Sequence, residues 1–359
     1  MNVGVIGAGR QGKRRVSVLR QFPDHRLVAV ADTNLDAARA LAQEWGAQAV
    51  DCWRAVVDAS TVDVVVVSVP PADHAPIAIA AVEAGKPVLI EKPLARTLDE
   101  SEAILQAAAR RGVVVKCGFN LRFHPGIRKA HDLAVNGDLG TLTFMRCRYG
   151  IGGRAGYDQE WRAFPGIAGG GELMDRGTHV VDLFRWFMGD FAEASAMIAS
   201  FYWKFQGGME DNAFGLLRTP RGQIAAFHVS ATQWRHLFSL EVFGTEGYAL
   251  VNGLGYVYGP EALAVGRRND DGSAFVEEVT EFVGDDRSWA EEWLEFVSAI
   301  REHRQPLGNG EDGLEALRLV AALYESGQTG RTVLLPADPG VPLRAGASHC
   351  GTQVHAPKA

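Results

Sequence analysis

Residues 2–12, NVGVIGAGRQG, decide the fold of the first part of the chain. A short apolar run enters the pattern Gly-x-Gly-x-x-Gly, and a helical pattern follows through Val16 and Leu19. Strand, glycine turn and helix in this order are typical of a dinucleotide-binding βαβ unit, in which the glycines allow a tight turn, close approach of a pyrophosphate and helix–strand packing. We therefore expect a dinucleotide at Gly7, Ala8, Gly9, Arg10, Gln11 and Gly12.

The next apolar run, residues 27–31, ends at Asp32, twenty residues beyond Gly12. A carboxylate at this place accepts the hydroxyls of an adenosine ribose and repels a 2′-phosphate. The sequence therefore favours NAD over NADP. NADP stays open as the less favoured cofactor, because a phosphate could be neutralised by the nearby cations Arg10, Lys13, Arg14 and Arg15.

Strand and helix patterns keep alternating through residue 117, with apolar runs at 63–68, 87–90 and 113–117. Such runs are typical of parallel strands buried on both faces, so we predict an α/β domain with a doubly wound, Rossmann-type parallel sheet over residues 1–121. Ligands of these sheets bind at the carboxyl ends of the strands. The residues expected there, as cofactor contacts, are Ser68, Pro70, His74, Glu91 and Lys92. Two alternatives remain: His74 as a helix cap and Lys92 as a solvated lysine.

Residues 169–186, GGGELMDRGTHVVDLFRW, combine a glycine-rich loop with a helical pattern. At about 100° per residue, Leu173, Gly177 and Val180 project to one side. Asp175, His179 and Asp182 form one line on nearly the opposite side. A histidine that titrates near neutral pH, with carboxylates beside it, suits proton transfer. The alternative is a solvated helix face with a chance Asp-His pair.

The remainder of the chain is predicted to form a second α/β domain over residues 122–335. Helical patterns cover 125–135, 288–302 and 311–325, and strand-like runs cover 141–149, 192–205, 211–219, 223–231, 237–243 and 248–251. Residues 336–359 are rich in Pro, Gly, Ala and His without periodicity, and we expect a flexible tail.

Composition excludes several classes of protein. The chain has a net charge of −7, and its sequence contains no run of basic residues. Both features argue against nucleic acid and anionic membranes as partners. The longest apolar stretch, residues 64–69, is far too short to span a bilayer. The four cysteines fit neither a metal site nor a disulfide framework. We therefore expect a cytoplasmic protein with reduced thiols and no metal.

Four segments together resemble the Gfo/Idh/MocA family of oxidoreductases, which includes glucose–fructose oxidoreductase and inositol dehydrogenases. They are the glycine turn, Glu91-Lys92-Pro93, residues 118–125 (GFNLRFHP) and residues 169–182, and the resemblance covers about residues 1–330. It implies a second domain with an open, mostly antiparallel sheet that forms a homodimer or homotetramer. It also implies that Lys92, Asp175 and His179 are catalytic, and that the Lys92-Pro93 peptide is cis.

Members of this family usually oxidise or reduce a secondary alcohol of a sugar, cyclitol or nucleotide-sugar. By that resemblance a small sugar-like substrate is expected to contact Lys92, Asp175, His179 and Asp182. Further substrate contacts are expected at Arg122, Tyr157 and Arg162, which lie in or near the segments expected to form the cleft, and Asn120 is expected at the cofactor. Anionic substrates stay open because of arginines near the expected cleft: Arg122, Arg154, Arg162, Arg176 and Arg235. Two other functions also stay open: NAD-dependent glycosidase chemistry, and regulation by a nucleotide-binding protein without turnover.

Alcohol oxidation needs a base for the hydroxyl proton and a cation for the developing alkoxide. His179 is the expected base, because its ordinary pKa is about 6.5. Lys92 would polarise the oxygen, or act as base if its pKa were lowered. Asp175 would pair with one of these two groups. This assignment predicts a pH–rate limb near the ordinary histidine pKa, which disappears in His179→Ala.

Overall fold

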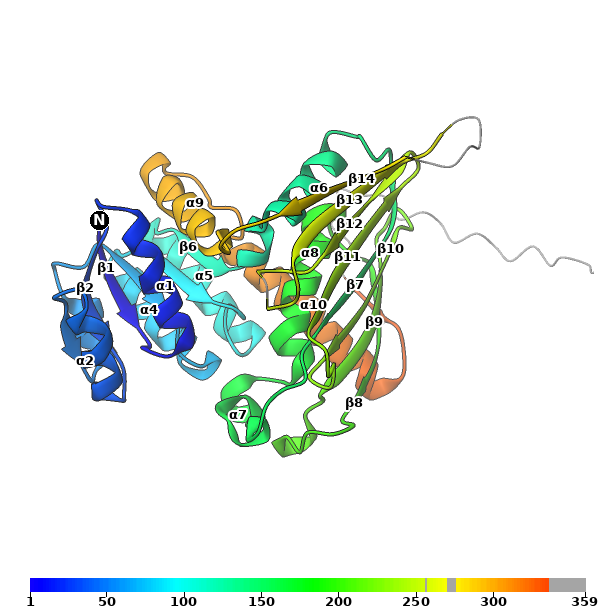
Figure 1. The fold of residues 1–359 in the computed structure, drawn as a ribbon. Coiled ribbons are helices and arrows are strands. Elements are labelled where there is room, and N and C mark those ends of the chain that lie inside the picture. The colour runs from blue at the N-terminus through cyan, green and yellow to red at the C-terminus, as the bar shows by residue number, and fades with distance from the viewer. Residues whose placement is uncertain (256, 270–275, 336–359) are drawn as a thin grey trace, which may run out of the picture.

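The computed structural model describes residues 1–255, 257–269 and 276–335, so the tail expected at 336–359 lies outside the described residues. Two sheets with their helices make up the described chain (Figure 1). In this part of the chain, no helix combines the length and the apolar character needed to cross a membrane.

The first sheet, in the described chain, has six parallel strands in the order β3-β2-β1-β4-β5-β6. This order confirms the predicted doubly wound sheet. Its central strand β4 consists of four valines, each at most 1% exposed, because helices cover both faces. The elements are β1 (Asn2–Ile6), α1 (Arg10–Val18), β2 (Arg26–Ala31), α2 (Leu35–Gln43), β3 (Gln48–Val50), α3 (Trp53–Asp58), β4 (Val64–Val67), α4 (His74–Glu83), β5 (Val88–Glu91), α5 (Leu98–Arg111) and β6 (Val115–Gly118).

The second sheet has nine strands within the described residues, in the order β14-β13-β12-β11-β7-β10-β9-β8-β15. All neighbours are antiparallel except β10 and β7, which confirms an open, mostly antiparallel sheet. Its strands are β7 (Leu142–Gly150), β8 (Glu193–Ala199), β9 (Asn212–Arg218), β10 (Ile224–Ser230), β11 (Leu237–Gly244), β12 (Gly247–Asn252), β13 (Glu261–Arg267), β14 (Glu277–Phe282) and β15 (Val333–Leu334).

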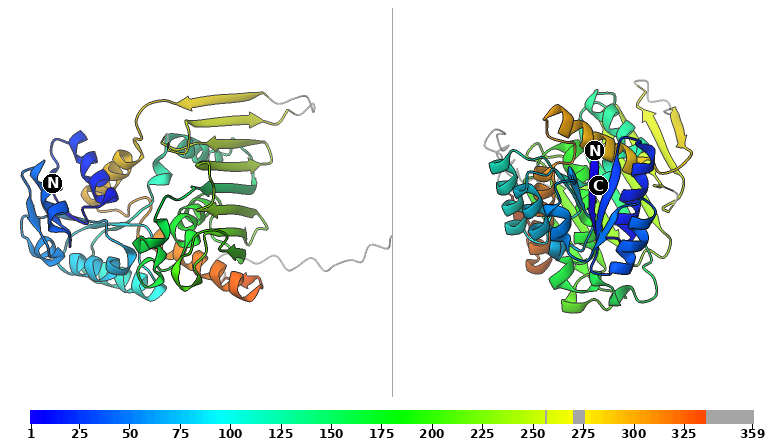
Figure 2. Two further views of the ribbon diagram at one scale, coloured as in Figure 1. Left: turned by 60° about the horizontal axis from the view of Figure 1, so that its bottom comes forward. Right: turned by 90° about the vertical axis from the view of Figure 1, so that its left-hand side faces the viewer.

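Helices cover only one face of this second sheet. Three of them, α6 (Pro125–Val135), α8 (Thr178–Met188) and α10 (Gly310–Thr329), lie between the two sheets (Figures 1 and 2). The opposite face carries no helix of the described chain. Strand β9 alternates buried and exposed residues as a one-sided sheet requires. Apolar side chains are exposed on strands of this sheet at Phe144, Met197, Phe214, Leu216 and Ile224.

Helix α9 (Ser288–Glu302) has the predicted bounds but packs on the first domain, beside α1 (Figure 1). Its side chains Trp289, Trp293 and Phe296 are buried in the same core cluster as residues of β1 and α1. Residues 288–302 therefore return to the domain that was predicted to end at residue 121.

Two local differences from the predicted elements have visible causes. The strand expected at 192–205 ends at Ala199, because the Asp211 carboxylate accepts three successive backbone N–H groups and turns the chain there. The helix expected after the three glycines begins as a π-helical segment, Leu173–Gly177, which continues into α8. Such wide turns are frequent at functional sites.

Candidate active site

A cavity of about 1040 Å³ lies where the carboxyl ends of the first sheet face the second domain. The glycine turn and the segments after β2, β4 and β5 form one wall. Residues from β7, the loop 151–162 and the segment 175–179 form the other. The cavity is large enough for a dinucleotide together with a small substrate.

The glycine turn is shaped to admit a pyrophosphate. A Cβ on Gly12 would lie 1.8 Å from the carbonyl oxygen of Gly7, and one on Gly7 would lie 2.5 Å from that of Ser68. Beside Gly9, in contrast, a Cβ would meet no atom within 4 Å, and Gly9 lines the cavity. Gly7 and Gly12 thus bring backbone together, whereas Gly9 leaves open space in front of the first turn of α1. The backbone N–H groups at the start of α1 have no partner within the helix, and a phosphate in the open space beside Gly9 could accept hydrogen bonds from them.

Polar groups around this turn also fit a dinucleotide. The side-chain oxygens of Gln11 and Ser68 are buried without a hydrogen-bond partner in the described chain, and both residues line the cavity. Arg10 lines it as well. Ala8 and Gly12, expected at the cofactor, do not line the cavity. The N–H of Ala8 instead donates to Asp32 Oδ2 at 2.7 Å.

Asp32 stands at the cavity wall as expected, at the end of β2. Its other oxygen accepts the N–H of Asn34 at 2.8 Å, so the carboxylate is held by backbone on both sides. Asp51 and Trp53 line the same region. The sequence analysis missed these two residues because it predicted no strand at 48–50, and β3 is what brings them beside Asp32.

Lys92 and Asp175 meet across the two domains. Lys92 follows β5, and its peptide bond to Pro93 is cis. The Lys92 ammonium donates to the backbone oxygen of Asp175 at 2.6 Å and forms an ion pair with its carboxylate. The other carboxylate oxygen lies 3.6 Å from both Arg162 and Arg176. Burial alone would raise the pKa of Asp175, but Lys92, Arg176 and Arg162 hold it well below its usual value.

His179 lies one turn after Asp175 and lines the cavity, with only 6% of its surface exposed. The rings of Phe119 and Tyr149 flank it, with centroids 6.1 and 6.4 Å away. Its Nδ1 is buried and has no partner among the described residues. Burial first, and then the positive charge of Lys92, lower the pKa of His179 well below its ordinary value. The expected titration near neutral pH is therefore displaced to lower pH.

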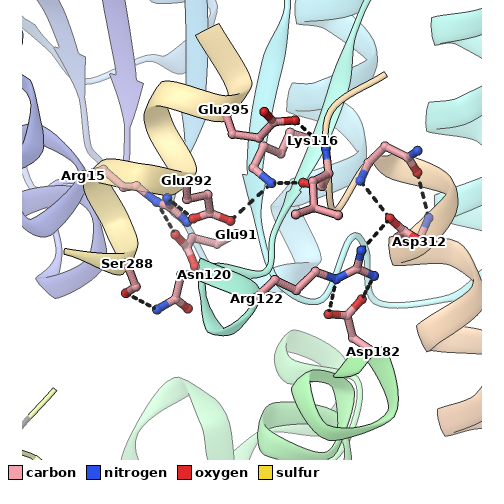
Figure 3. A network of polar contacts seen from close by, with 12 residues as sticks. Arg15, Glu91, Lys116, Asn120, Arg122, Asp182, Ser288, Glu292, Glu295 and Asp312 are labelled. Carbon is pink, nitrogen blue, oxygen red and sulfur yellow. Dashed lines mark hydrogen bonds and ion pairs between the residues drawn. The ribbon is translucent and has the colours of Figure 1, made fainter. Parts of the chain in front are cut away.

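Arg122 and Asp182, both expected at the substrate, do not line the cavity. They form a buried pair instead, with Arg122 Nε and Nη2 donating to the Asp182 carboxylate at 2.9 and 2.5 Å (Figure 3). Arg122 also donates to Asp312 at 3.1 Å. Asp182 is one turn beyond His179 along α8 and lies outside the cavity lining. The guanidinium group of Arg122 contacts it there, where a substrate was expected. An interior ion pair thus replaces the expected substrate contacts.

His74 also lies outside the cavity lining, contrary to the expected cofactor contact. It is completely buried. Glu91 borders the cavity, but its carboxylate accepts Arg15 Nε at 2.7 Å, and Arg15 in turn contacts Glu292 of α9 at 2.5 Å (Figure 3). A cofactor contact of the Glu91 side chain is therefore replaced by a buried network that joins α1, β5 and α9.

The remaining expected residues line the cavity. Tyr157 donates its hydroxyl to Glu172 at 3.0 Å, and Asn120 donates to Ser288 at 3.2 Å. Arg162 donates to Glu160 at 2.9 Å. Pro70 follows β4 at the same wall. Further cavity residues that the sequence analysis did not single out are Tyr149, Glu160, His236 and Tyr258. They come from strands and loops of the second domain and share no motif with the predicted residues.

No group of His, Cys, Asp and Glu side chains within the described ranges is arranged to hold a metal ion. The assembled chemistry is therefore that of a dinucleotide cradle beside a lysine, a carboxylate and a buried histidine. These groups can bind a hydroxyl, move its proton and stabilise an oxyanion.

Comparison with known proteins identifies the family. Residues 1–119 match the oxidoreductase family with an NAD-binding Rossmann fold, GFO_IDH_MocA, and residues 127–250 match the GFO/IDH/MocA C-terminal domain. The 1,5-anhydro-D-fructose reductase of Ensifer adhaerens is 30% identical over 330 residues, which is 91% of this chain and 96% of that protein. The levoglucosan dehydrogenase of Pseudarthrobacter phenanthrenivorans is 30% identical over 288 residues, covering 70% of this chain and 73% of that protein.

Solved structures agree with these relatives. Levoglucosan dehydrogenase in complex with NADH superimposes with a TM-score of 0.85 at 26% identity, covering 94% of this chain and 99% of that one. The structure of the same enzyme with NADH and levoglucosan superimposes with a TM-score of 0.84. Myo-inositol 2-dehydrogenase of Thermotoga maritima is 27% identical over 93% of this chain and 98% of that protein. The chain belongs to the Gfo/Idh/MocA family and is an NAD(P)-dependent dehydrogenase of the sugar and cyclitol type.

Proposed function

We propose that this enzyme transfers a hydride between NAD and a secondary alcohol of a neutral sugar or cyclitol, with His179 as the base, Lys92 as the polarising cation and Asp175 as their electrostatic partner. One observation carries the proposal. Lys92 from the first domain and Asp175 from the second are in contact beside His179, in the cavity that also contains the glycine turn.

When bound, the nicotinamide ring supplies the hydride acceptor or donor. Lys92 has three N–H donors. Two of its contacts in the described chain go to Asp175, and we assign the third donor to the reacting oxygen. His179, kept neutral by its lowered pKa, takes the hydroxyl proton. Lys92, Arg162 and Arg176 surround Asp175, and their positive charge favours the oxyanion that develops as the proton leaves.

The pairing of the cavity arginines supports a neutral substrate. Arg154 and Arg162 donate to the same oxygen of Glu160, at 2.7 and 2.9 Å. Arg176 forms an ion pair with Glu172. Because each of these guanidinium groups already has a carboxylate partner, its positive charge is largely balanced within the protein and attracts a further anion less strongly. The curated relatives are named for levoglucosan, 1,5-anhydro-D-fructose and inositol, which are uncharged molecules.

The residues at the part of the cavity expected to hold the adenosine ribose support NAD over NADP as the cofactor. Asp32 and Asp51 both line this part of the cavity, and two carboxylates oppose a 2′-phosphate more strongly than one. Relatives differ in this respect: levoglucosan dehydrogenase is described with NADH, and one D-xylose dehydrogenase of Haloferax volcanii is named for NADP.

The uncovered face of the second sheet supports assembly into a homodimer or homotetramer. Exposed Met197, Phe214 and Leu216 lie on its adjacent strands β8 and β9, and apolar patches of this kind mark association surfaces. Light scattering on the purified protein gives the molar mass of the assembly. Met197→Lys with Leu216→Lys should convert it to monomers, whereas a monomeric wild type would contradict the assignment.

The proposed reaction is tested by NADH absorbance against a panel of cyclitols, aldoses, anhydrosugars and, for contrast, sugar phosphates. Wild type should reduce NAD with one neutral polyol class. His179→Ala should lower kcat by about 10²–10⁴-fold and leave NAD affinity nearly unchanged, because His179 belongs to the second domain. Lys92→Met should remove most turnover. Near-normal kcat in both variants would contradict the assigned chemistry.

A further inference from the structure

Two cavities meet at a shared wall beside the start of α6. The dinucleotide cavity of about 1040 Å³ and a second cavity of about 780 Å³ both have His124, Gly255 and Asp286 in their lining. Residues of α9 and β14 form much of the second cavity, which reaches solvent at Val283, a residue that is 86% exposed. A side chain in the shared wall therefore adjoins both the reaction space and a route to solvent.

His124 is the histidine of this wall, and a carboxylate fixes its tautomer. The ring is 4% exposed, and its Nδ1 donates to Glu261 Oε2 at 2.9 Å. The other oxygen of Glu261 accepts the backbone N–H of Gly126 at 2.7 Å. Because an ionised carboxylate only accepts hydrogen bonds, Nδ1 carries the hydrogen, and Nε2 of the neutral ring is left as a proton acceptor. A histidine oriented in this way is suited to moving protons.

Carboxylates lie on both sides of the His124 ring. Glu261 contacts Nδ1, and Asp286 Oδ1 lies 4.0 Å from Nε2. An imidazolium at this position therefore has a negative partner on each side. The arginines that line the second cavity each form an ion pair with another carboxylate; they are Arg128 with Asp132, Arg287 with Glu291 and Arg304 with Glu295.

His179 has the opposite surroundings. Burial, and then the positive charge of Lys92, lower the pKa of His179 well below its ordinary value. The proposed reaction places a proton on this ring in every oxidation. Since the ring is only 6% exposed, that proton leaves through the cavity that His179 lines. A positive charge on His124 also lowers the pKa of His179, so the two rings lie within electrostatic reach of each other.

We propose that His124 is a proton relay that returns His179 to its neutral form after each oxidation. The imidazolium of His179 loses its proton through cavity water to Nε2 of His124. Nε2 then releases the proton past Asp286 into the second cavity and solvent. One proton thus leaves for each hydride transferred, and both rings return to the neutral form. Glu261 is the positioning residue of this relay. The inference rests on the proposed function, because it requires His179 as the base.

His124→Ala removes the relay and keeps the base. In a stopped-flow experiment with NAD and a polyol in weak buffer, its first turnover should form NADH as wild type does, because His179 still accepts one proton. Later turnovers should be about tenfold to hundredfold slower, which is less than the full effect of losing a general base. A pH indicator should record the proton together with NADH in wild type and after NADH in the variant.

Imidazole and further variants separate a relay from a structural defect. Free imidazole fits the space that the ring vacates and should restore the turnover of His124→Ala. His124→Phe fills that space and should stay slow at the same imidazole concentration. Glu261→Gln should also delay the proton, because its amide can donate to Nδ1 and leave the hydrogen on Nε2. His131→Ala is the matched control for lost stability, since this partly buried ring of α6 lines neither cavity.

The inference is supported if the proton lags behind NADH in the His124 and Glu261 variants alone and imidazole rescues His124→Ala. Proton release that keeps pace with NADH in His124→Ala would overturn it, and so would slow turnover that imidazole leaves unchanged. If wild type oxidised no polyol, the proposed function would fail and the relay with it. Normal wild-type turnover with unaltered His124 variants would overturn the relay alone.

Discussion

Asp175→Asn tests how the charges around His179 set its proton affinity. Burial, and then Lys92, lower the pKa of His179, whereas Asp175 raises it. The substitution removes that one negative charge and keeps the shape of the side chain. With the two groups about 6 Å apart, one helical turn, and an effective dielectric constant of about 20, Coulomb's law gives about 3 kcal/mol, or about two pH units. The pKa of His179 should therefore fall further.

The sign follows from the reaction. His179 accepts a proton during oxidation only when neutral, so the rate falls on the acid side of its pKa. In wild type this limb should lie below pH 6.5, because the pKa is already lowered. In Asp175→Asn the limb should move about two units further down. The plateau should fall about tenfold, since a weaker base takes the proton less readily and about half of the shift is felt in the transition state.

The assay combines an NMR titration of the His179 ring with kcat for oxidation, both extended downward from about pH 9 to the lowest pH at which the enzyme stays folded, because both limbs lie on the acid side of the ordinary histidine pKa. Asp132→Asn is the control, because it makes the same change at an exposed carboxylate of α6 that does not line the cavity, and it should leave the limb in place. A wild-type His179 that titrates at or above the ordinary value would refute the reasoning. So would a limb that moves to higher pH in Asp175→Asn.

Three further predictions concern other parts of the chain. Asp32→Ser should narrow the preference for NAD over NADP at least tenfold, since the lost hydrogen bond between the ribose of NAD and the charged carboxylate is worth about 1.5–3 kcal/mol; titration of both cofactors checks it, and an unchanged ratio of the two dissociation constants would contradict it. Gly12→Ala should abolish detectable NADH binding, because its Cβ would lie 1.8 Å from the Gly7 oxygen; normal fluorescence titration would exclude this cradle. Burial raises the pKa of Glu210 to about 7. The folded state thus binds the extra proton, and stability falls as pH rises from about 4.5 to about 7. Above pH 7, Glu210→Gln should therefore be more stable than wild type, by about 3 kcal/mol at most. Denaturant titrations of both proteins, below and above this pH range, give the free energies of unfolding that test this difference.

Local sequence patterns predicted most of the fold. Neighbouring residues along the chain determine the glycine turn, the valine strand β4 and the bounds of α6 and α9. Tertiary contacts change these elements little, so a local pattern is enough to predict them. The edge strand β14 and its neighbour β13 were not predicted. Strand β14 is mostly exposed and has a charged sequence, so it lacks the apolar alternation that marks a strand.

The site was predicted less completely, because periodicity gives the face of a helix but not what packs on it. Asp182 shares a face with His179, yet Arg122, sixty residues earlier in the chain, binds it in the interior. Likewise, a histidine at position 179 suggested a pKa near neutral pH, whereas the surroundings of this side chain in the folded protein lower its pKa. Burial and the approach of Lys92 depend on contacts between domains, which no local pattern contains.

The return of α9 to the first domain makes that domain discontinuous. A nascent chain that ends near residue 121 lacks the side chains of Trp289, Trp293 and Phe296, so the core around α1 is completed only after strands β7 to β14 have been synthesised. The same arrangement limits recombination between family members. A Rossmann domain exchanged as residues 1–121 alone would pair Arg15 and Lys116 with a foreign residue at the position of Glu292. An exchange that keeps these ion pairs therefore carries residues 288–302 together with residues 1–121.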